Sequence, residues 1–206
     1  IKYLKQSQQF DDQLPVTYYN LGLAYYNLYQ YDKAIPEFEK ALEIYNKWGS
    51  KPSWAYNYIL LGDAYRKTGQ YKKVKKLCKK AEQDFPDDFY LIALQGILSF
   101  TEGDTIAANL NFEKCRSILK SNSSSEADIT SGLAMIYFEA GILDKAEKYY
   151  RQALSLEPKS PVWMNNLAYF LIDKDKNINE GLELVDKALK LNPDNYLYLD
   201  CKGWGL

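Results

Sequence analysis

The sequence predicts an all-α fold, an α-solenoid in which antiparallel helix pairs stack one after another. Three observations lead to this class. Short side chains recur at a period of about 34 residues along most of the 206-residue chain. The residues between them are apolar at the spacing of an amphipathic helix. Glycines and prolines fall between the apolar stretches, where helices end.

Small residues mark the place where the two helices of each unit cross. Gly22 and Ala34 lie twelve residues apart, and Ala41 follows seven residues later. The pattern returns, with one extra residue in its last copy, at Gly62, Val74 and Ala81; Gly96, Ala108 and Cys115; Ala134, Ala146 and Ala153; and Ala168, Gly181 and Ala188. Only short side chains let two helix backbones approach closely, so each copy predicts one antiparallel helix pair.

Turn and cap residues separate the predicted helices. Glycines suited to the left-handed conformation after a helix lie between the two helices of three units, at Gly69, Gly103 and Gly141. We expect Asp32 and Asp144 to cap the second helices of their units. Prolines, which cannot continue a helix interior, close three units at Pro86, Pro158 and Pro193.

Other residues keep fixed places within the unit. The first copy contains Tyr18, Leu21, Gly22, Tyr25, Ala34, Phe38 and Ala41. The second contains Tyr58, Leu61, Gly62, Tyr65, Ala81 and Pro86, and the fourth Leu133, Ala134, Tyr137, Ala146, Tyr150, Ala153 and Pro158. With bulky, small, aromatic and proline residues in this order, the chain resembles the tetratricopeptide repeat family, and more closely its bacterial members.

We expect one domain over residues 1–206. It divides into a partial repeat 1–14, repeats 15–54, 55–88, 89–126, 127–160 and 161–195, and a partial repeat 196–206. Extra residues lengthen two turns, at Trp48–Pro52 and at Asn122–Ser125, the second of which is expected to be the most flexible stretch. Incomplete units at both ends suggest a segment of a longer array.

The resemblance implies a right-handed superhelix whose first helices line a concave groove. It places fourteen candidate peptide-binding residues there: Tyr19, Leu23, Tyr26, Tyr56, Ile59, Asp63, Arg66, Tyr90, Ile97, Phe100, Met135, Phe138, Asn165 and Tyr169. Asn20 and Asn166, at position 6 of their units, join them as candidates for hydrogen bonds to a peptide backbone. Val16 and Val162 occupy corresponding positions. Aromatic anchors in a concave patch are where binding energy concentrates. The alternative is that these side chains pack against the second helix or the next unit.

Some family members grip acidic chaperone C-termini with a two-carboxylate clamp, which needs Lys and Asn at positions 5 and 9 of one unit. Tyr19 and Leu23 hold these positions in the first unit, and Ile59 and Asp63 in the second. No window matches, so no such clamp is expected.

Composition argues against several other functions. The net charge is -1 and there is no histidine, so neither a nucleic-acid partner, a common zinc site nor a histidine base is expected. Phosphate-binding glycine motifs are missing too. The basic stretch from Arg66 to Lys80 is interpreted as a solvated helix face. Cys78 and Cys115 fall at core positions of the unit.

The predicted function is therefore a non-catalytic scaffold, without cofactor or metal, that binds a peptide or helix of a partner protein in its groove. Self-assembly into a homo-oligomer, or service as the regulatory arm of a larger enzyme, are the alternatives. No signal peptide or membrane-spanning run is visible. The sequence leaves both a cytoplasmic and a periplasmic location open.

Overall fold

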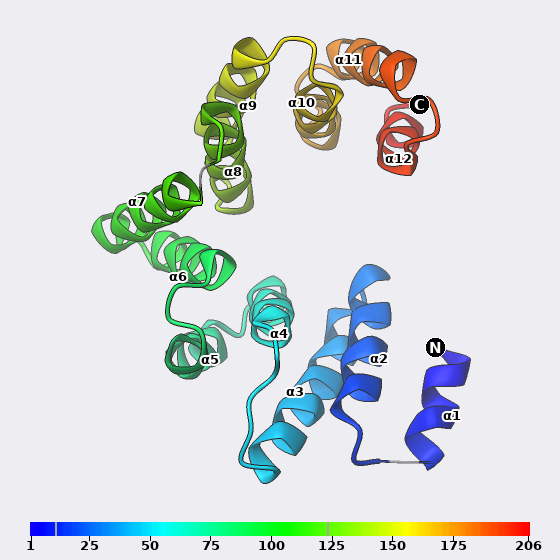
Figure 1. Cartoon of the computed structure of the whole chain (residues 1–206), viewed down its shortest axis with the longest axis vertical. Helices are drawn as coiled ribbons and strands as arrows, with labels where there is room; N and C mark the ends of the chain where they lie inside the picture. The colour runs from blue at the N-terminus through cyan, green and yellow to red at the C-terminus, as the bar shows by residue number, and fades with distance from the viewer. Residues whose placement is uncertain (11, 123) are drawn as a thin grey trace. The chain divides into compact units, whose positions relative to one another are not determined.

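The structure is a computed structural model of the chain, and it describes residues 1–10, 12–122 and 124–206. All regular structure in these residues is α-helical (Figure 1), as the sequence predicts. Ser123, in the second lengthened turn, lies outside the described residues, so the flexibility expected there stays a prediction.

The described residues form helices with these bounds: α1 Lys2–Phe10, α2 Pro15–Asn27, α3 Tyr31–Lys47, α4 Tyr56–Lys67, α5 Tyr71–Asp84, α6 Phe89–Thr101, α7 Thr105–Ser121, α8 Glu126–Glu139, α9 Leu143–Leu156, α10 Pro161–Asp173, α11 Ile178–Leu191 and α12 Tyr196–Trp204. Four helices begin at a residue where a repeat is predicted to begin, namely α2, α6, α10 and α12. The division into repeats itself stays a prediction.

The chain separates into two compact units, Ile1–Asn111 and Phe112–Leu206, and the division falls inside α7. In the first unit, α2 packs against α3 and α4 against α5, while α1 lies against α2 and α6 contacts both α4 and α5. In the second unit, α8 packs against α9 and α10 against α11, with α12 against both α10 and α11. Consecutive helix pairs therefore stack within each unit, as in an α-solenoid.

Small residues lie at the helix crossings, as predicted. Ala34, Val74 and Ala146 are completely buried. A Cβ atom added to Gly22 would lie 2.7 Å from two ring carbons of Phe38. A Cβ atom on Gly181 would lie 2.7 Å from Cγ1 of Ile172. These distances are shorter than side-chain contacts allow, so glycine sets how closely the paired helices approach.

The turns inside the helix pairs share one backbone geometry. Gly69, Gly103 and Gly141 have φ angles of +74°, +84° and +75°, which confirms the predicted left-handed residues. Tyr29 and Asp175 adopt the same conformation in the first and fifth repeats, with φ angles of +56° and +49°. In each case the next residue donates its N–H to a carbonyl five residues earlier, as Gln70 does to Tyr65 at 2.8 Å. This is the Schellman ending of a helix.

The prediction that Asp32 and Asp144 cap their helices is wrong. The N-cap residues of α3 and α9 are Gln30 and Ile142, and neither makes a side-chain capping bond. The Schellman turn leads directly into the next helix, so each aspartate falls within the first turn instead. There its negative charge still favours the positive end of the helix dipole.

A charged cluster joins α9 to α11 in the second unit. Arg151 donates from Nη1 and Nη2 to the two carboxylate oxygens of Glu180, at 2.6 and 3.0 Å, and from Nε to Glu147 at 3.0 Å. The hydrogen bonds from Arg151 hold the pKa of Glu180 below its usual range. The guanidinium and carboxylate groups are both planar, and two parallel hydrogen bonds between them add geometric specificity as well as energy.

We expect Glu180→Gln to lower the free energy of unfolding by about 0.5–1 kcal/mol at pH 7, because both partners are partly exposed to solvent. The lowered pKa of Glu180 means that its contribution is full above the unfolded value of 4.5 and is lost as the pH falls through the folded value. Denaturant unfolding at pH 7 and pH 3 measures this difference. Glu183→Gln, exposed on the same helix, is the control; equal losses at both pH values would contradict the prediction.

Candidate functional site

An exposed strip of mostly aromatic side chains runs across the first helices of the first unit. Val16 on α2, Tyr56 on α4 and Tyr90 on α6 hold the same place near the start of their helices and are 53%, 51% and 44% exposed. The rings of Tyr56 and Tyr90 lie 6.3 Å apart. With Tyr19, these residues are named the aromatic strip. Adjacent exposed apolar groups of this kind mark interaction surfaces.

Tyr19 forms the half-buried base of the aromatic strip. Its ring lies 6.0 Å from Phe38 in the core. Burial, and next the neighbouring Tyr56, raise the pKa of Tyr19, and burial also raises the pKa of Tyr90. Both hydroxyls therefore stay protonated, and the strip offers neutral phenols rather than charges. Asn20, one residue further along α2, is exposed.

Three other candidate residues are hydrogen-bonded to one another. Tyr26 donates from its hydroxyl to Oδ2 of Asp63 at 2.6 Å. Arg66 donates to Oδ1 of the same carboxylate from Nε at 2.9 Å and from Nη2 at 2.6 Å. This network ties α2 to α4, so these three residues help to hold the first helices of two neighbouring repeats together. Leu23 and Ile59 are half-buried, and Ile59 packs against the core of the first unit.

Ile97 does not take the place that the resemblance implies. Its side chain is only 6% exposed, whereas Phe100 on the same helix is half-buried. Helix α6 is apolar on nearly every face, with Leu91, Leu94 and Leu98 buried as well. A helix of this composition is covered on several sides. Ile97 therefore belongs to the core.

In the second unit, the candidate residues gather where α8 meets α10. The ring centres of Phe138 and Tyr169 lie 6.2 Å apart. Nζ of Lys174 lies 4.8 Å from the centre of the Phe138 ring. Tyr169 is 43% exposed. Asn166 donates to the hydroxyl of Ser131 at 3.2 Å, which joins the two helices. Met135 and Asn165 are half-buried, and Oδ1 of Asn165 has no hydrogen-bond partner among the described residues.

A pocket beside the aromatic strip involves residues that the sequence patterns miss. Its volume is about 210 Å³, and its lining combines Val16, Tyr19, Asn20 and Tyr56 with Tyr45, Pro52, Ser53, Trp54 and Asn57. The last five residues come from the end of α3, the long turn and the start of α4. The extra length of that turn is the one signal in the sequence that points to this place.

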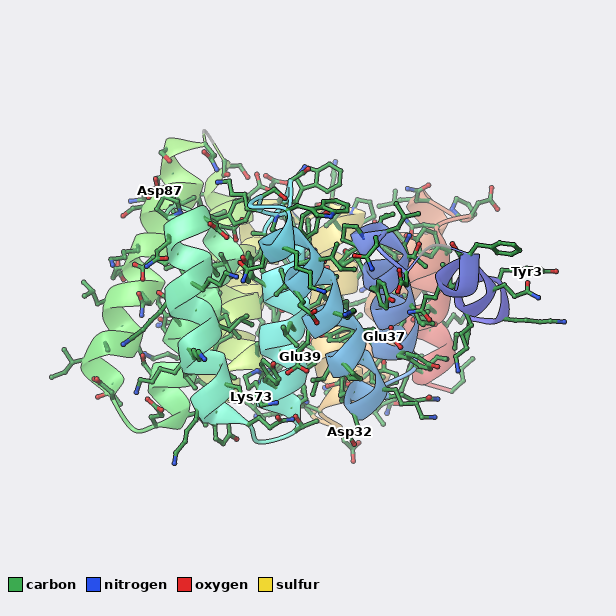
Figure 2. All side chains as sticks on the ribbon, turned by 90° about the horizontal axis from the view of Figure 1, so that it is seen from below. Tyr3, Asp32, Glu37, Glu39, Lys73 and Asp87 are labelled. Carbon is green, nitrogen blue, oxygen red and sulfur yellow. The ribbon has the colours of Figure 1, made fainter. Side chains whose placement is uncertain are left out.

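The lysines of the basic stretch from Lys72 to Lys80 form an exposed face of α5, as the sequence suggests, whereas Arg66 lies on α4 and is largely buried against Asp63. Lys73 pairs with Glu39 of α3 at 3.3 Å, and the two side chains lie together in Figure 2. Lys75 pairs with Glu102 at 2.9 Å. Both ion pairs are more than a third exposed and contribute little to stability. They link α5 to its neighbours on either side.

All three cysteines are buried, which confirms the core interpretation of Cys78 and Cys115. Burial raises the pKa of Cys78 to about 12 and that of Cys201 to about 11. Among the described residues, no three His, Cys, Asp or Glu side chains gather where they could hold a metal ion. No helix in the described ranges combines the length and apolar character needed to cross a bilayer.

Stacked helix pairs that expose aromatic side chains on their first helices define a helical-repeat protein built for interaction with other polypeptides. Two models described as tetratricopeptide repeat match the chain, over residues 13–84 and 127–160, which together make up about half of it. The chain belongs to the tetratricopeptide repeat family. Proteins of this family are generally non-catalytic scaffolds for protein–protein interaction.

Curated proteins are similar to parts of the chain. The chain is 26% identical over 184 residues to the TPR repeat-containing protein PA4667 of Pseudomonas aeruginosa, covering 88% of this chain and 30% of the relative. It is 39% identical over 69 residues to the uncharacterized protein ycf37 of Pyropia yezoensis, covering 34% and 38%. It is also 25% identical over 129 residues to the photosystem I assembly protein Ycf3 of a Synechococcus strain, covering 56% and 72%. The chain thus spans about a third of the length of the first two relatives.

Solved structures share the fold. YrrB, described as a tetratricopeptide repeat protein with an unusual peptide-binding site, matches with a TM-score of 0.51 and 20% identity over 97% of both chains. The thermophilic protein TTC0263 of Thermus thermophilus matches with a TM-score of 0.53 and 23% identity, covering 92% of this chain and 98% of the other. These likenesses establish a helical-repeat solenoid.

Proposed function

We propose that the chain is a non-catalytic scaffold whose first helices bind an extended or helical segment of a partner polypeptide. The observation that carries the proposal is the aromatic strip, where Val16, Tyr56 and Tyr90 are each close to half exposed on three neighbouring helices of one unit. Burying such groups under a partner releases apolar surface from water. Their rings are also rigid, so little side-chain freedom is lost on binding.

Two comparisons support this proposal. YrrB carries a peptide-binding site on a fold of the same kind. Ycf3 is named for the assembly of a protein complex, photosystem I, which is consistent with a scaffold that holds another polypeptide. The second unit offers a comparable surface in Phe138 and Tyr169, where Tyr169 is 43% exposed. We assign the same role to that surface.

A peptide display library supplies ligands for the test. The whole chain is used to enrich peptides, and the affinity of an enriched peptide is then measured for the wild type and its variants. Tyr56→Ser and Tyr90→Ser should each weaken binding about tenfold or more, because exposed aromatic anchors carry much of the energy of an interface. The melting temperature should barely change, because both side chains lie at the surface.

Tyr196→Ser, which changes a tyrosine that is 76% exposed on α12 in the other unit, is the matched control and should leave the affinity unchanged. Unchanged affinity in both strip variants, with the fold intact, would rule out the strip as the binding surface. A mass that rises with concentration in the absence of any peptide would instead favour the self-assembly alternative.

A further inference from the structure

Another pocket lies in the second unit, where α9 and α11 both pack against α10. Its volume is about 390 Å³. Leu154, Met164, Leu167 and Leu184 give it an apolar lining, and Lys187 of α11 lies beside them. The pocket shares no residue with the candidate peptide-binding surfaces of either unit, so a ligand here goes beyond the proposed function.

The first unit has a corresponding space between α3 and α5, which both pack against α4. Counted from the small residues at the helix crossings, α3 corresponds to α9, α4 to α10 and α5 to α11. An ion pair spans one end of the space in both units. It joins Lys73 to Glu39 at 3.3 Å in the first unit and Arg151 to Glu180 at 2.6 Å in the second. The signs of the charges are exchanged, but the two pairs hold the same positions.

The other end of the space is bridged in the first unit and not in the second. Lys80 donates to Oδ1 of Asn46 at 2.8 Å, which links α5 to α3. Counted in the same way, Lys187 corresponds to Lys80 and Pro158 to Asn46. A proline side chain offers no hydrogen-bond acceptor. Lys187 makes no hydrogen bond or ion pair with any residue that the structure describes, so its ammonium group is available to a ligand.

A further difference concerns the helix under this space. Tyr58 of α4 is 1% exposed and donates from its hydroxyl to Oδ2 of Asp84 at 2.6 Å, so its ring extends from α4 to α5. Met164 holds the corresponding position on α10 and lines the pocket. A thioether side chain is flexible and adapts to a neighbouring group. Where the first unit has a ring of its own, the second unit has room for a side chain from a partner.

The charges around the pocket favour a carboxylate at one end. Arg151 is bonded to both Glu180 and Glu147, so its charge is already balanced. Lys187 follows Glu180 by two helical turns, about 10 Å along α11. Its charge is the smallest of the recorded causes that lower the pKa of Glu180. A carboxylate placed next to Lys187 would therefore supply a counter-charge that the described residues do not.

The volume and the lining of the pocket together define the ligand. A pocket of about 390 Å³ falls within the range of about 300–1,000 Å³ that is usual for ligand sites. We propose that it binds an acidic segment of a partner polypeptide, in which a bulky apolar side chain contacts Met164 and Leu184 and a neighbouring aspartate or glutamate pairs with Lys187. The apolar side chain takes the place that Tyr58 has in the first unit, and the carboxylate takes the place of Asn46.

Three capped dipeptides test this ligand. N-acetyl-Phe-Glu-amide, N-acetyl-Phe-Gln-amide and N-acetyl-Ala-Glu-amide are each titrated into the whole chain, whose two methionines carry ¹³C-labelled methyl groups. We expect N-acetyl-Phe-Glu-amide to bind with a Kd of about 1 mM, as befits a fragment. It should shift the NMR signal of Met164 and leave that of Met135 in place. Loss of the carboxylate should weaken binding about threefold, the effect of one exposed ion pair, and loss of the ring should weaken it at least about fivefold.

Variants that exchange residues between the two units locate the site. Lys187→Gln should abolish the preference for the glutamate dipeptide over the glutamine dipeptide, and Pro158→Asn, which gives Lys187 the amide partner that Lys80 has, should reduce it. Met164→Tyr restores the ring of the first unit and should weaken binding of N-acetyl-Phe-Glu-amide about tenfold, as followed through the amide signals of α11. Lys80→Gln, the same change at the corresponding position of the first unit, is the control and should bind like the wild type. Lys187 is exposed, so Lys187→Gln decides the question even if Met164→Tyr disturbs the fold.

Several results would overturn the proposal. They are a shift of Met135 in place of Met164, no shift of either signal, equal affinities for the three dipeptides, or an unchanged preference for glutamate in Lys187→Gln. The aromatic strip is tested separately. Tyr56→Ser and Tyr90→Ser should leave the binding of N-acetyl-Phe-Glu-amide unchanged, because neither tyrosine lines this pocket. Failure of the strip variants to affect a display-selected peptide would therefore count against the proposed function and not against this pocket.

Discussion

Replacing Phe38 with alanine should lower the free energy of unfolding of the first unit by about 3–5 kcal/mol. The ring of Phe38 is completely buried and fills the space where α2 and α3 cross. Alanine would leave a cavity that the helix pair cannot fully close, so both burial and packing are lost. Hydrogen exchange followed by mass spectrometry would report the loss in the first unit separately from the second. Phe10→Ala, at a ring that is 93% exposed, is the control and should change little.

Gly22 supplies a stricter form of the same test. The Cβ atom of Gly22→Ala would meet the Phe38 ring at 2.7 Å, and such overpacking typically costs about 1–3 kcal/mol. The better helix propensity of alanine offsets about 1 kcal/mol of that cost. In a Phe38→Leu background the added methyl should be tolerated more easily, because the ring edge is gone. Strictly additive effects of the two changes would show that the two residues do not compete for the same space.

Replacing Asp63 with alanine should cost about 2–3 kcal/mol of unfolding free energy, because one carboxylate accepts hydrogen bonds from both Tyr26 and Arg66. The side chains of Arg66 and Asp63 are only 14% and 17% exposed, so water replaces the lost contacts poorly. Hydrogen exchange in α2 and α4 measures the effect.

Two variants divide the Asp63 effect between its partners. Tyr26→Phe removes only the bond from the phenol and should cost about 1 kcal/mol. Asp63→Asn keeps an acceptor but loses the charge, so its cost should fall between those of Tyr26→Phe and Asp63→Ala. If Asp63→Ala is as stable as the wild type, the network does not tie α2 to α4, and these residues would be free to serve a ligand instead.

The periodic features of this fold could be read from the sequence because they depend on local chemistry. Residues at the helix crossings, such as Gly22 and Ala34, must be short. Residues where a helix turns back, such as Gly69 and Gly103, must adopt a left-handed backbone conformation. Tyr29 also adopts that conformation, with a φ of +56°, which the sequence does not signal because a tyrosine there is unfavourable. The surrounding Schellman hydrogen bonds impose it.

Only part of the candidate site could be predicted from the sequence. Tyr56 and Tyr90 are exposed because their place near the start of a first helix directs them away from the paired helix. Trp54 lies in an irregular turn and Asn57 at a repeat position to which the sequence patterns assign no role, and their meeting in a pocket depends on how that turn folds. Ile97 is buried because α6 is apolar on nearly every face, so repeat position alone does not determine exposure. Packing between helices settles these cases.

One buried thiol in each unit can report when that unit opens. Cys78 lies in the first unit and Cys201 in the second, and both are at most 4% exposed. Because the thiolate is the form that reacts, their raised pKa values leave them nearly inert toward oxidants and alkylating reagents while the helices are closed. Modification of either sulfur therefore reports the opening of the unit in which that cysteine lies, independently of the other unit.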